Sequence, residues 1–134
     1  MSSSAEAALQ LAIYTALKAN VALMARVNDV YDFVPESIEE PYLVIGDGNA
    51  TPFDTKDSAG QDHLITIHTW SKSQGAKETK EIMELVYSVL HNGALTVAGH
   101  QTVLCQYDFS TVLKDPDGFT HHGVQRFRVL TEDN

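Results

Sequence analysis

Apolar residues near the N-terminus recur at three- and four-residue spacing, which is the period of an amphipathic helix. They are Leu9, Ile13, Ala16 and Leu17. The pattern predicts a helix over about 5–19, preceded by a Ser3-x-x-Glu6 capping box. Asn20 is a suitable cap for a second, short helical piece over 21–26.

Downstream of these helices, alternating residues and short apolar runs indicate strands. The predicted strands cover 30–33, 42–45, 63–71, 95–97, 101–113 and 122–131. A second amphipathic helix is predicted over 76–91, and a tight turn over 98–100 joins the next two strands into a hairpin. Strands outnumber helices, which favours an α+β fold with helices packed on one face of a mainly antiparallel sheet.

One segment lacks both periods and is rich in Gly, Asn, Thr, Pro, Asp and Ser. It predicts a long, flexible loop over about 47–61, and loops of that length are usually functional or mobile. Phe53 is its one large apolar residue. An aromatic residue in such a loop either packs back on its own domain or contacts a partner.

Period-two alternation assigns side chains to the two faces of each strand. His63 and His68 are five positions apart and therefore point to opposite faces. In the last strand, Phe127 points inward and Arg126 and Arg128 point outward. In the strand before it, one face is predicted to be continuous from end to end. Its members are Val103, Cys105, Tyr107, Phe109, Thr111 and Leu113.

With 134 residues, 43% of them hydrophobic and 20% charged, the chain is expected to form one globular domain over 1–134. It contains no apolar run long enough for a membrane span and no basic, apolar leader. A single cysteine excludes an internal disulfide and makes a reducing cytoplasm the simplest setting.

The formal net charge is −9, and almost all of it comes from one stretch of the chain. Segment 29–62 holds nine acidic residues and one lysine, a net charge of −8. Proteins that grip DNA by its phosphates need the opposite sign, so tight nucleic-acid binding is not expected. The acidity either serves solubility or helps DNA to pass without sticking.

No catalytic or metal-binding motif is present. The six histidines lack His-Glu-x-x-His spacing, there is no Cys-x-x-Cys, and no Ser lies in a Gly-x-Ser-x-Gly context. Cys105 is expected to be a buried, unreactive thiol, and Asp115-Pro116-Asp117-Gly118 a turn rather than a calcium loop. We therefore expect no catalytic residue, no metal and no cofactor.

Several segments together resemble, in order and spacing, the small tail-completion or tail-terminator proteins of long-tailed phages, prophages and gene transfer agents. The segments are Leu9–Ala19, Val30-Tyr31-Asp32, Pro41–Gly46, His68-Thr69-Trp70-Ser71, Gly99-His100, Asp115–Gly118 and His122–Arg128. The resemblance spans nearly the whole chain and rests on the ordered set of these segments.

The resemblance implies an α+β structural protein without catalysis. It implies a ring, typically a hexamer, on the head-proximal end of the tail tube, where it ends tube polymerisation and presents the surface to which the head connector docks. DNA would pass through the ring without specific binding. The implied partners are the tail tube protein and the head–tail connector protein. The implied location is the tail or neck of a virion assembled in the cytoplasm of a bacterial host.

Two sets of residues are candidates for these contacts. A heterologous ring needs two different surfaces that meet, and one set supplies candidates for a subunit or tube interface. Its members are Thr51, Pro52, Phe53, Asp54, Arg126 and Arg128. The other set is a candidate DNA-repelling surface. Its members are Glu36, Glu39, Glu40, Asp47, Asp54 and Asp57. The two arginines could pair with the acidic segment of the same chain or of a neighbour.

Two alternatives stay open at this point. The first is another head–tail connector or neck component, which sequence separates poorly from a tail terminator. The second is a monomeric ligand-binding α+β domain or small enzyme, which requires a pocket with converging polar groups.

Overall fold

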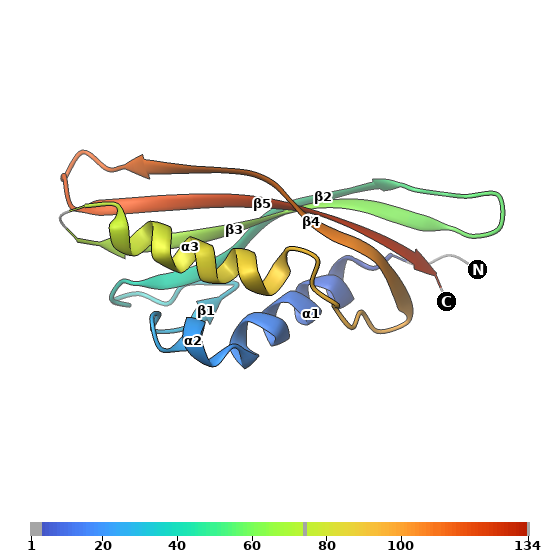
Figure 1. Ribbon diagram of the computed structural model, residues 1–134, viewed down its shortest axis with the longest axis horizontal. Helices are drawn as coiled ribbons and strands as arrows, with labels where there is room; N and C mark the ends of the chain where they lie inside the picture. Colours follow the sequence, from blue (N-terminus) through green and yellow to red (C-terminus); the bar gives the residue numbers. More distant parts are fainter. Residues whose placement is uncertain (1–3, 74, 134) are drawn as a thin grey trace.

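In the computed structural model, which describes residues 4–73 and 75–133, a long five-stranded sheet carries all helices on one face (Figure 1). The helices are α1 (Glu6–Ala19), α2 (Val21–Met24) and α3 (Lys77–Leu90). The strands are β1 (Val30–Tyr31), β2 (Tyr42–Pro52), β3 (Gly60–Lys72), β4 (His100–Lys114) and β5 (Thr120–Asp133). Their order is β1-β2-β3-β5-β4, and only the β1–β2 pair is parallel. The predicted α+β fold, mainly antiparallel with helices on one face, is confirmed.

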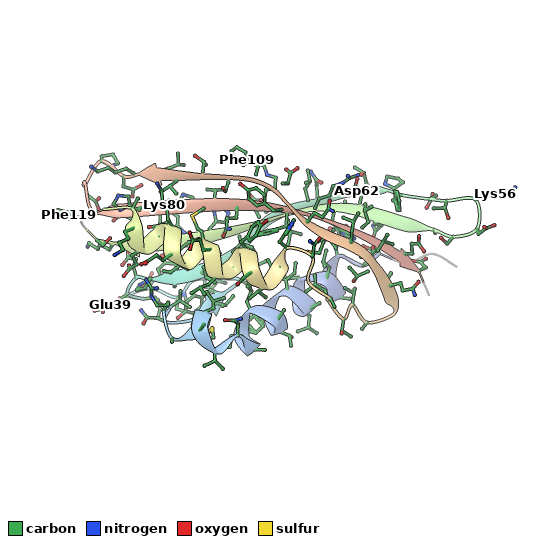
Figure 2. The ribbon with its side chains drawn as sticks, in the orientation of Figure 1. Glu39, Lys56, Asp62, Lys80, Phe109 and Phe119 are labelled. Atoms are coloured by element: carbon green, nitrogen blue, oxygen red, sulfur yellow. The ribbon has the colours of Figure 1, made fainter. Side chains whose placement is uncertain are left out.

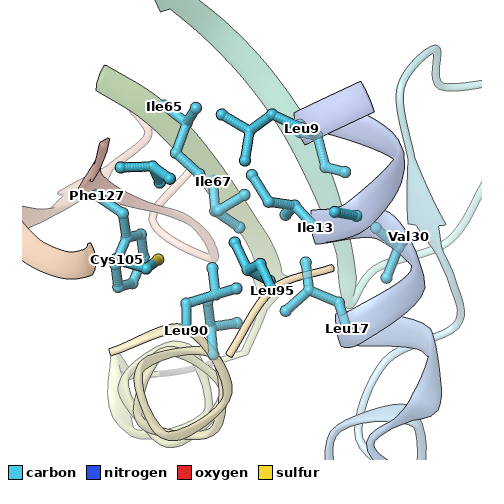
Figure 3. Close-up of a cluster of buried hydrophobic side chains, with 14 of the residues drawn as sticks. Leu9, Ile13, Leu17, Val30, Ile65, Ile67, Leu90, Leu95, Cys105 and Phe127 are labelled. Carbon is cyan, nitrogen blue, oxygen red and sulfur yellow. The ribbon is translucent and has the colours of Figure 1, made fainter. Parts of the chain in front are cut away.

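The core lies between the sheet and the helix layer (Figure 3). Leu9, Ile13 and Leu17 of α1 face the middle strands, as their spacing predicted. Leu90 of α3 packs beside Phe127 of β5. Burial of these faces is the main force that holds the helices on the sheet, at roughly 25 cal/mol per Å² of apolar surface.

The helix starts agree only partly with the predicted caps. The Asn20 side chain caps α2 as expected, accepting a hydrogen bond from the Leu23 N–H at 2.8 Å. At α1 the preceding residue is Ala5, with no side-chain cap, and the Glu6 N–H donates to Ser4 Oγ at 3.3 Å. The predicted capping residue Ser3 lies outside the described residues.

The prediction of a long loop over 47–61 is wrong. β2 continues to Pro52 and β3 begins at Gly60, so the connection shrinks to 53–59 at the tip of a projecting hairpin (Figure 1). The two arms are held by main-chain pairing, from Gly48 opposite Ile65 to Pro52 opposite Gln61. Backbone hydrogen bonds do not depend on apolar side chains, so a polar composition does not prevent the strands from forming.

Two further strand predictions are corrected. The predicted 95–97 strand does not form, although Leu95 and Val97 are buried and Leu95 accepts a hydrogen bond from the Thr102 hydroxyl. The continuous face predicted for β4 is broken by two register shifts, between Thr102 and Leu104 and between Tyr107 and Phe109. Each irregularity reverses the alternation. Cys105 and Phe109 therefore lie on opposite faces, with Cys105 buried and Phe109 exposed.

The first strand is also shorter than predicted and ends at Tyr31 instead of Phe33. Phe33 therefore falls in the connection to β2, where its side chain is exposed. The faces predicted for β3 and β5 are confirmed: His63 and Phe127 are buried under the helices. His68 and Arg126 lie on the opposite face, which no described helix covers. We call this helix-free side the open face of the sheet.

Candidate functional site

The two candidate arginines share the open face, as their spacing predicted. Arg128 forms a bidentate ion pair with Asp62 of β3. Its Nε donates to Oδ1 at 3.0 Å and its Nη2 donates to Oδ2 at 2.7 Å. The guanidinium lowers the pKa of Asp62, chiefly through these hydrogen bonds. Arg126 lies over the Phe109 ring of β4, 5.3 Å from its centroid. The acidic partner of Arg128 is therefore in its own chain.

The other interface candidates gather at the hairpin tip that projects beyond the helices (Figure 1). Phe53 is only partly exposed and folds back on the hairpin, with its N–H donating to the Gly60 carbonyl at 2.9 Å. Asp54 Oδ1 accepts from the Gly60 N–H at 3.2 Å. Thr51 and Pro52 at the end of β2 are exposed. Of the two possibilities for Phe53, packing on its own domain is the one seen.

Gly60 makes this close packing possible. An added Cβ would lie 2.5 Å from the Thr131 carbonyl oxygen and 2.6 Å from the Phe53 carbonyl oxygen. Both atoms belong to the backbone and cannot move aside cheaply. At Gly60 the hairpin is therefore packed closely between the β5 backbone and the backbone of Phe53.

The candidate DNA-repelling acids do not form one patch. Glu36, Glu39 and Glu40 lie in the connection between β1 and β2, whereas Asp54 and Asp57 lie at the hairpin tip. Figure 2 shows the two places, marked by Glu39 and Lys56, at opposite ends of the molecule. Asp47 lies between them in β2 and is exposed. The acidic segment therefore supplies two separate acidic surfaces.

Sequence reasoning did not find an aromatic cluster on the open face. His122 of β5 stacks on Trp70 of β3, with ring centroids 3.9 Å apart, and on His68 at 4.9 Å. His68 Nδ1 and His122 Nε2 share a hydrogen bond of 2.6 Å. These rings and Tyr42 line a hollow of about 590 Å³. The alternation along β3 indicates that His68 and Trp70 share a face. That His122 lies opposite Trp70 depends on the register between β3 and β5, which only the structure shows.

A groove between α3 and β4 was also missed. It measures about 620 Å³ and has Gln125 of β5 among its lining residues. Tyr87 of α3 and Tyr107 of β4 meet edge to face inside it, 5.4 Å between centroids. The apolar stripe of α3 indicates which side of the helix faces the sheet. Which β4 side chains meet that helix depends on the second bulge of β4, and the sequence pattern does not reveal this bulge.

Neither an activated cysteine nor a metal-binding cluster is found among the described residues. Burial raises the pKa of the Cys105 thiol to about 11, which keeps it protonated and unreactive. Within 4–73 and 75–133, no group of three or more His, Cys, Asp or Glu side chains is placed to hold a metal ion. None of the helices in these ranges is both long and apolar enough to cross a membrane.

Comparisons with known proteins agree with this architecture. A family model described as tail completion protein gp17 matches residues 11–132. Tail completion protein gp17 of Bacillus phage SPP1 is 33% identical over 130 residues, covering 97% of this chain and 96% of that protein.

Two solved structures are also similar. The structure of bacteriophage SPP1 gp17 matches with a TM-score of 0.66 at 33% identity, over 97% of this chain and 91% of that one. A chain in the virion of a native gene transfer agent particle has a TM-score of 0.90, covering 98% of this chain and 99% of that one. Its identity is 24%, so that likeness concerns the fold. Given the family match and the SPP1 relative, this chain belongs to the family of phage tail completion protein gp17, the structural proteins of phage tails.

Proposed function

We propose that this protein forms a ring on the head-proximal end of a phage-type tail tube. The ring ends tube polymerisation and gives the surface to which the head docks. It acts by binding alone, with no catalysis and no cofactor. The observation that carries the proposal is the 33% identity to a tail completion protein across 97% of the chain. The ring is typically a hexamer, located in the virion tail or neck and assembled in the host cytoplasm.

The shape of the fold supports head-to-tail assembly. A ring is built from heterologous contacts, in which one surface of a subunit meets a different surface of the next. β1 and β4 are the two opposite edges of this sheet, and the β2–β3 hairpin projects from one end (Figure 1). Exposed strand edges and projecting hairpins are common means of protein–protein contact.

The partners in this proposal are the tail tube protein on one side of the ring and the head–tail connector protein on the other. The hairpin tip, with Thr51, Pro52, Phe53 and Asp54, is proposed as a contact for a subunit or for the tube. Arg126 and Arg128 on the open face are proposed for the same kind of contact. Of the two, Arg126 is the better candidate, because the charge of Arg128 is already balanced by Asp62.

Mixing the purified protein with polymerising tail tube protein tests the proposal. We expect tubes capped at one end and no further growth from that end, seen by negative-stain imaging, with light scattering giving a ring-sized mass. Continued growth at both ends and no bound density would contradict it. Binding to the connector alone, without any effect on the tubes, would instead favour another neck component.

A second part of the proposal concerns DNA, which passes through the ring without specific binding. We infer that acids facing the lumen repel phosphates and keep the passage free. The separation of the acids leaves two surfaces to test. One variant carries Glu36, Glu39 and Glu40 changed to Gln, and the other carries Asp54 and Asp57 changed to Asn. We expect one of them to slow DNA release from assembled particles. Wild-type release rates in both would refute the inference.

A further inference from the structure

The groove between α3 and β4 is open and has a polar floor. Its volume of about 620 Å³ exceeds that of a single aromatic side chain several-fold. Lys80, Glu84 and Tyr87 line it from α3, and Tyr107 and Val112 from β4. The inner side of β4 is therefore covered around Cys105 but partly open around Val112, beyond α3.

Gln125 at the floor lacks one hydrogen bond. Its side chain is only 2% exposed, and its Nε2 donates to the Met83 carbonyl at 2.9 Å. Its Oε1 finds no donor within the described residues. A buried acceptor without a partner is unfavourable, so a donor from outside the chain is expected to complete it. The groove is therefore a built site, with an apolar wall and one unfilled polar position.

A candidate occupant is exposed elsewhere on the same chain. Phe33 is 83% exposed in the connection between β1 and β2. Its neighbours Asp32, Glu36 and Glu39 are exposed too. Segment 32–40 thus presents a large apolar ring among acidic side chains. It contains four acids and no base.

Four lysines near the groove have no acidic partner among the described residues of their own chain and could pair with acids of another copy. Of the nine Lys and Arg residues, four lie at the end of the molecule where α3 begins, and none of these four forms an ion pair within the described part of the chain. They are Lys72, Lys77, Lys80 and Lys114. Lys72 of β3 lies opposite Thr120 of β5, and Lys114 of β4 lies opposite the next residue, His121. Lys80 lines the groove itself. The lining itself holds one acid, Glu84, beside Lys80. Of the other acids in α3 and in the β4–β5 turn, Glu81 pairs with Arg26, Glu78 accepts from the Ser71 hydroxyl and Asp117 accepts from the Thr120 hydroxyl, which leaves Glu84 and Asp115 against the four lysines.

The segment and the groove lie at opposite edges of the sheet. Segment 32–40 follows β1 at one edge, and the groove lies along β4 at the other. A copy therefore cannot close this contact on itself, but two copies side by side can join edge to edge. Such a contact repeats head to tail, which is the geometry that a closed ring requires.

We propose that segment 32–40 of one copy docks in the α3–β4 groove of the next copy. This inference rests on the proposed ring. The Phe33 ring packs against Tyr87 and Tyr107. Gln125 Oε1, which is fully buried in the free chain, accepts from a main-chain N–H beside Phe33 after its side chain turns toward the groove. The acids of the segment face Lys80 and its neighbours. Aromatic anchors buried in a pocket contribute much of the binding energy of many interfaces, and complementary charges around them favour specificity and fast association.

Replacing Phe33 by Ser tests the anchor. The side chain is exposed, so we expect the variant to fold normally, and the Kd of subunit association to rise about tenfold or more. Phe119→Ser is the matched control, since Phe119 is 51% exposed at the β4–β5 turn and lies outside the groove (Figure 2). Its Kd should stay within about twofold of wild type, measured by light scattering over a dilution series.

A cysteine pair tests the geometry. We mix the Phe33→Cys protein with the Tyr87→Cys protein under mild oxidation. A disulfide forms only between cysteines whose Cβ atoms are close together, and the proposed contact brings these two positions together, so we expect a disulfide-linked heterodimer. The native Cys105 is buried, with its pKa raised to about 11, and should not interfere. The control mixture pairs Phe119→Cys with Tyr87→Cys and should give only background product.

The outcomes separate this interface from the ring itself. Normal oligomers from the Phe33→Ser protein, with no cross-link between positions 33 and 87, would overturn the interface and leave the ring standing. Normal oligomers combined with lost tube capping would assign Phe33 to a tube contact and likewise overturn it. A protein that stays monomeric, ignores tubes and gives no cross-link would overturn the proposed function as well.

Discussion

Replacing Phe127 by Ala should lower the free energy of unfolding by about 3–5 kcal/mol. Phe127 is fully buried, among the largest side chains of the core, and lies between β5 and α3 beside Leu90 and Cys105 (Figure 3). The loss combines the transfer free energy of the ring with the cavity that remains. Since small domains are stable by only about 5–15 kcal/mol, this single change should remove a large part of the total.

Urea unfolding followed by circular dichroism measures this loss. Phe109→Ala is the matched control, because the same side chain is removed from the exposed open face (Figure 2). There we expect a loss of no more than about 1 kcal/mol, from the contact with the Arg126 guanidinium. Equal losses at the two positions would mean that the helix layer does not enclose Phe127 as described.

Mild acidification should lower the free energy of unfolding. We expect this loss to begin near pH 6.5, well before the carboxylates take up protons. Burial is the main cause that lowers the pKa of His63, of His68 and of His122 below the usual 6.5. The unfolded chain therefore takes up protons before the folded one does. The stabilising contribution of these histidines is fully present above about pH 6.5. It is lost as the pH drops from there toward the pKa values of the folded protein. Each histidine contributes at most about 1.4 kcal/mol per pH unit in that window.

The surroundings of the three histidines moderate this effect without reversing it. Nearby acids raise each pKa: Glu6 and Asp62 that of His63, Asp47 that of His68, and Asp115 that of His122. Burial has the larger influence in all three. The pKa values of Asp29, Asp62 and Asp117 are lowered, so their stabilisation is lost only below about pH 4. They do not confound a comparison between about pH 7.5 and about pH 5.

Urea midpoints at these two pH values check the expectation. The wild-type midpoint should fall on acidification, and the fall should shrink when His68 and His122 are both changed to Gln. The remaining sensitivity then belongs to His63, which is buried and shares a 3.1 Å hydrogen bond with the Thr131 hydroxyl. An unchanged midpoint at the lower pH would show that the folded protein takes up these protons freely.

Side-chain periodicity predicted the parts of the fold that depend on burial. The stripe of α1, the inward position of Phe127 and the burial of Cys105 all follow from which residues avoid water. The same pattern placed His63 and His68 on opposite faces. The family resemblance was also carried by the sequence, and the match to tail completion protein gp17 confirms it.

Pairing between strands was not predictable in the same way. Residues 47–52 join β2 because their backbone bonds to β3, a force that leaves no apolar signature in Gly, Asn, Thr and Pro. A bulge in β4 turned Phe109 outward, under Arg126. An irregularity of one residue reverses every later side chain, and nothing in the period-two pattern announces it.

The sequence by itself determined the α+β class, the buried faces of α1, β3 and β5, and the family. Those properties depend on the order of apolar and polar residues, which each segment carries locally. Only the tertiary structure decided that Arg128 pairs with Asp62, that the acids divide between two ends, and that Gln125 lies in a groove opposite the edge that exposes Phe33. These depend on strand order and register, which arise when distant segments pair.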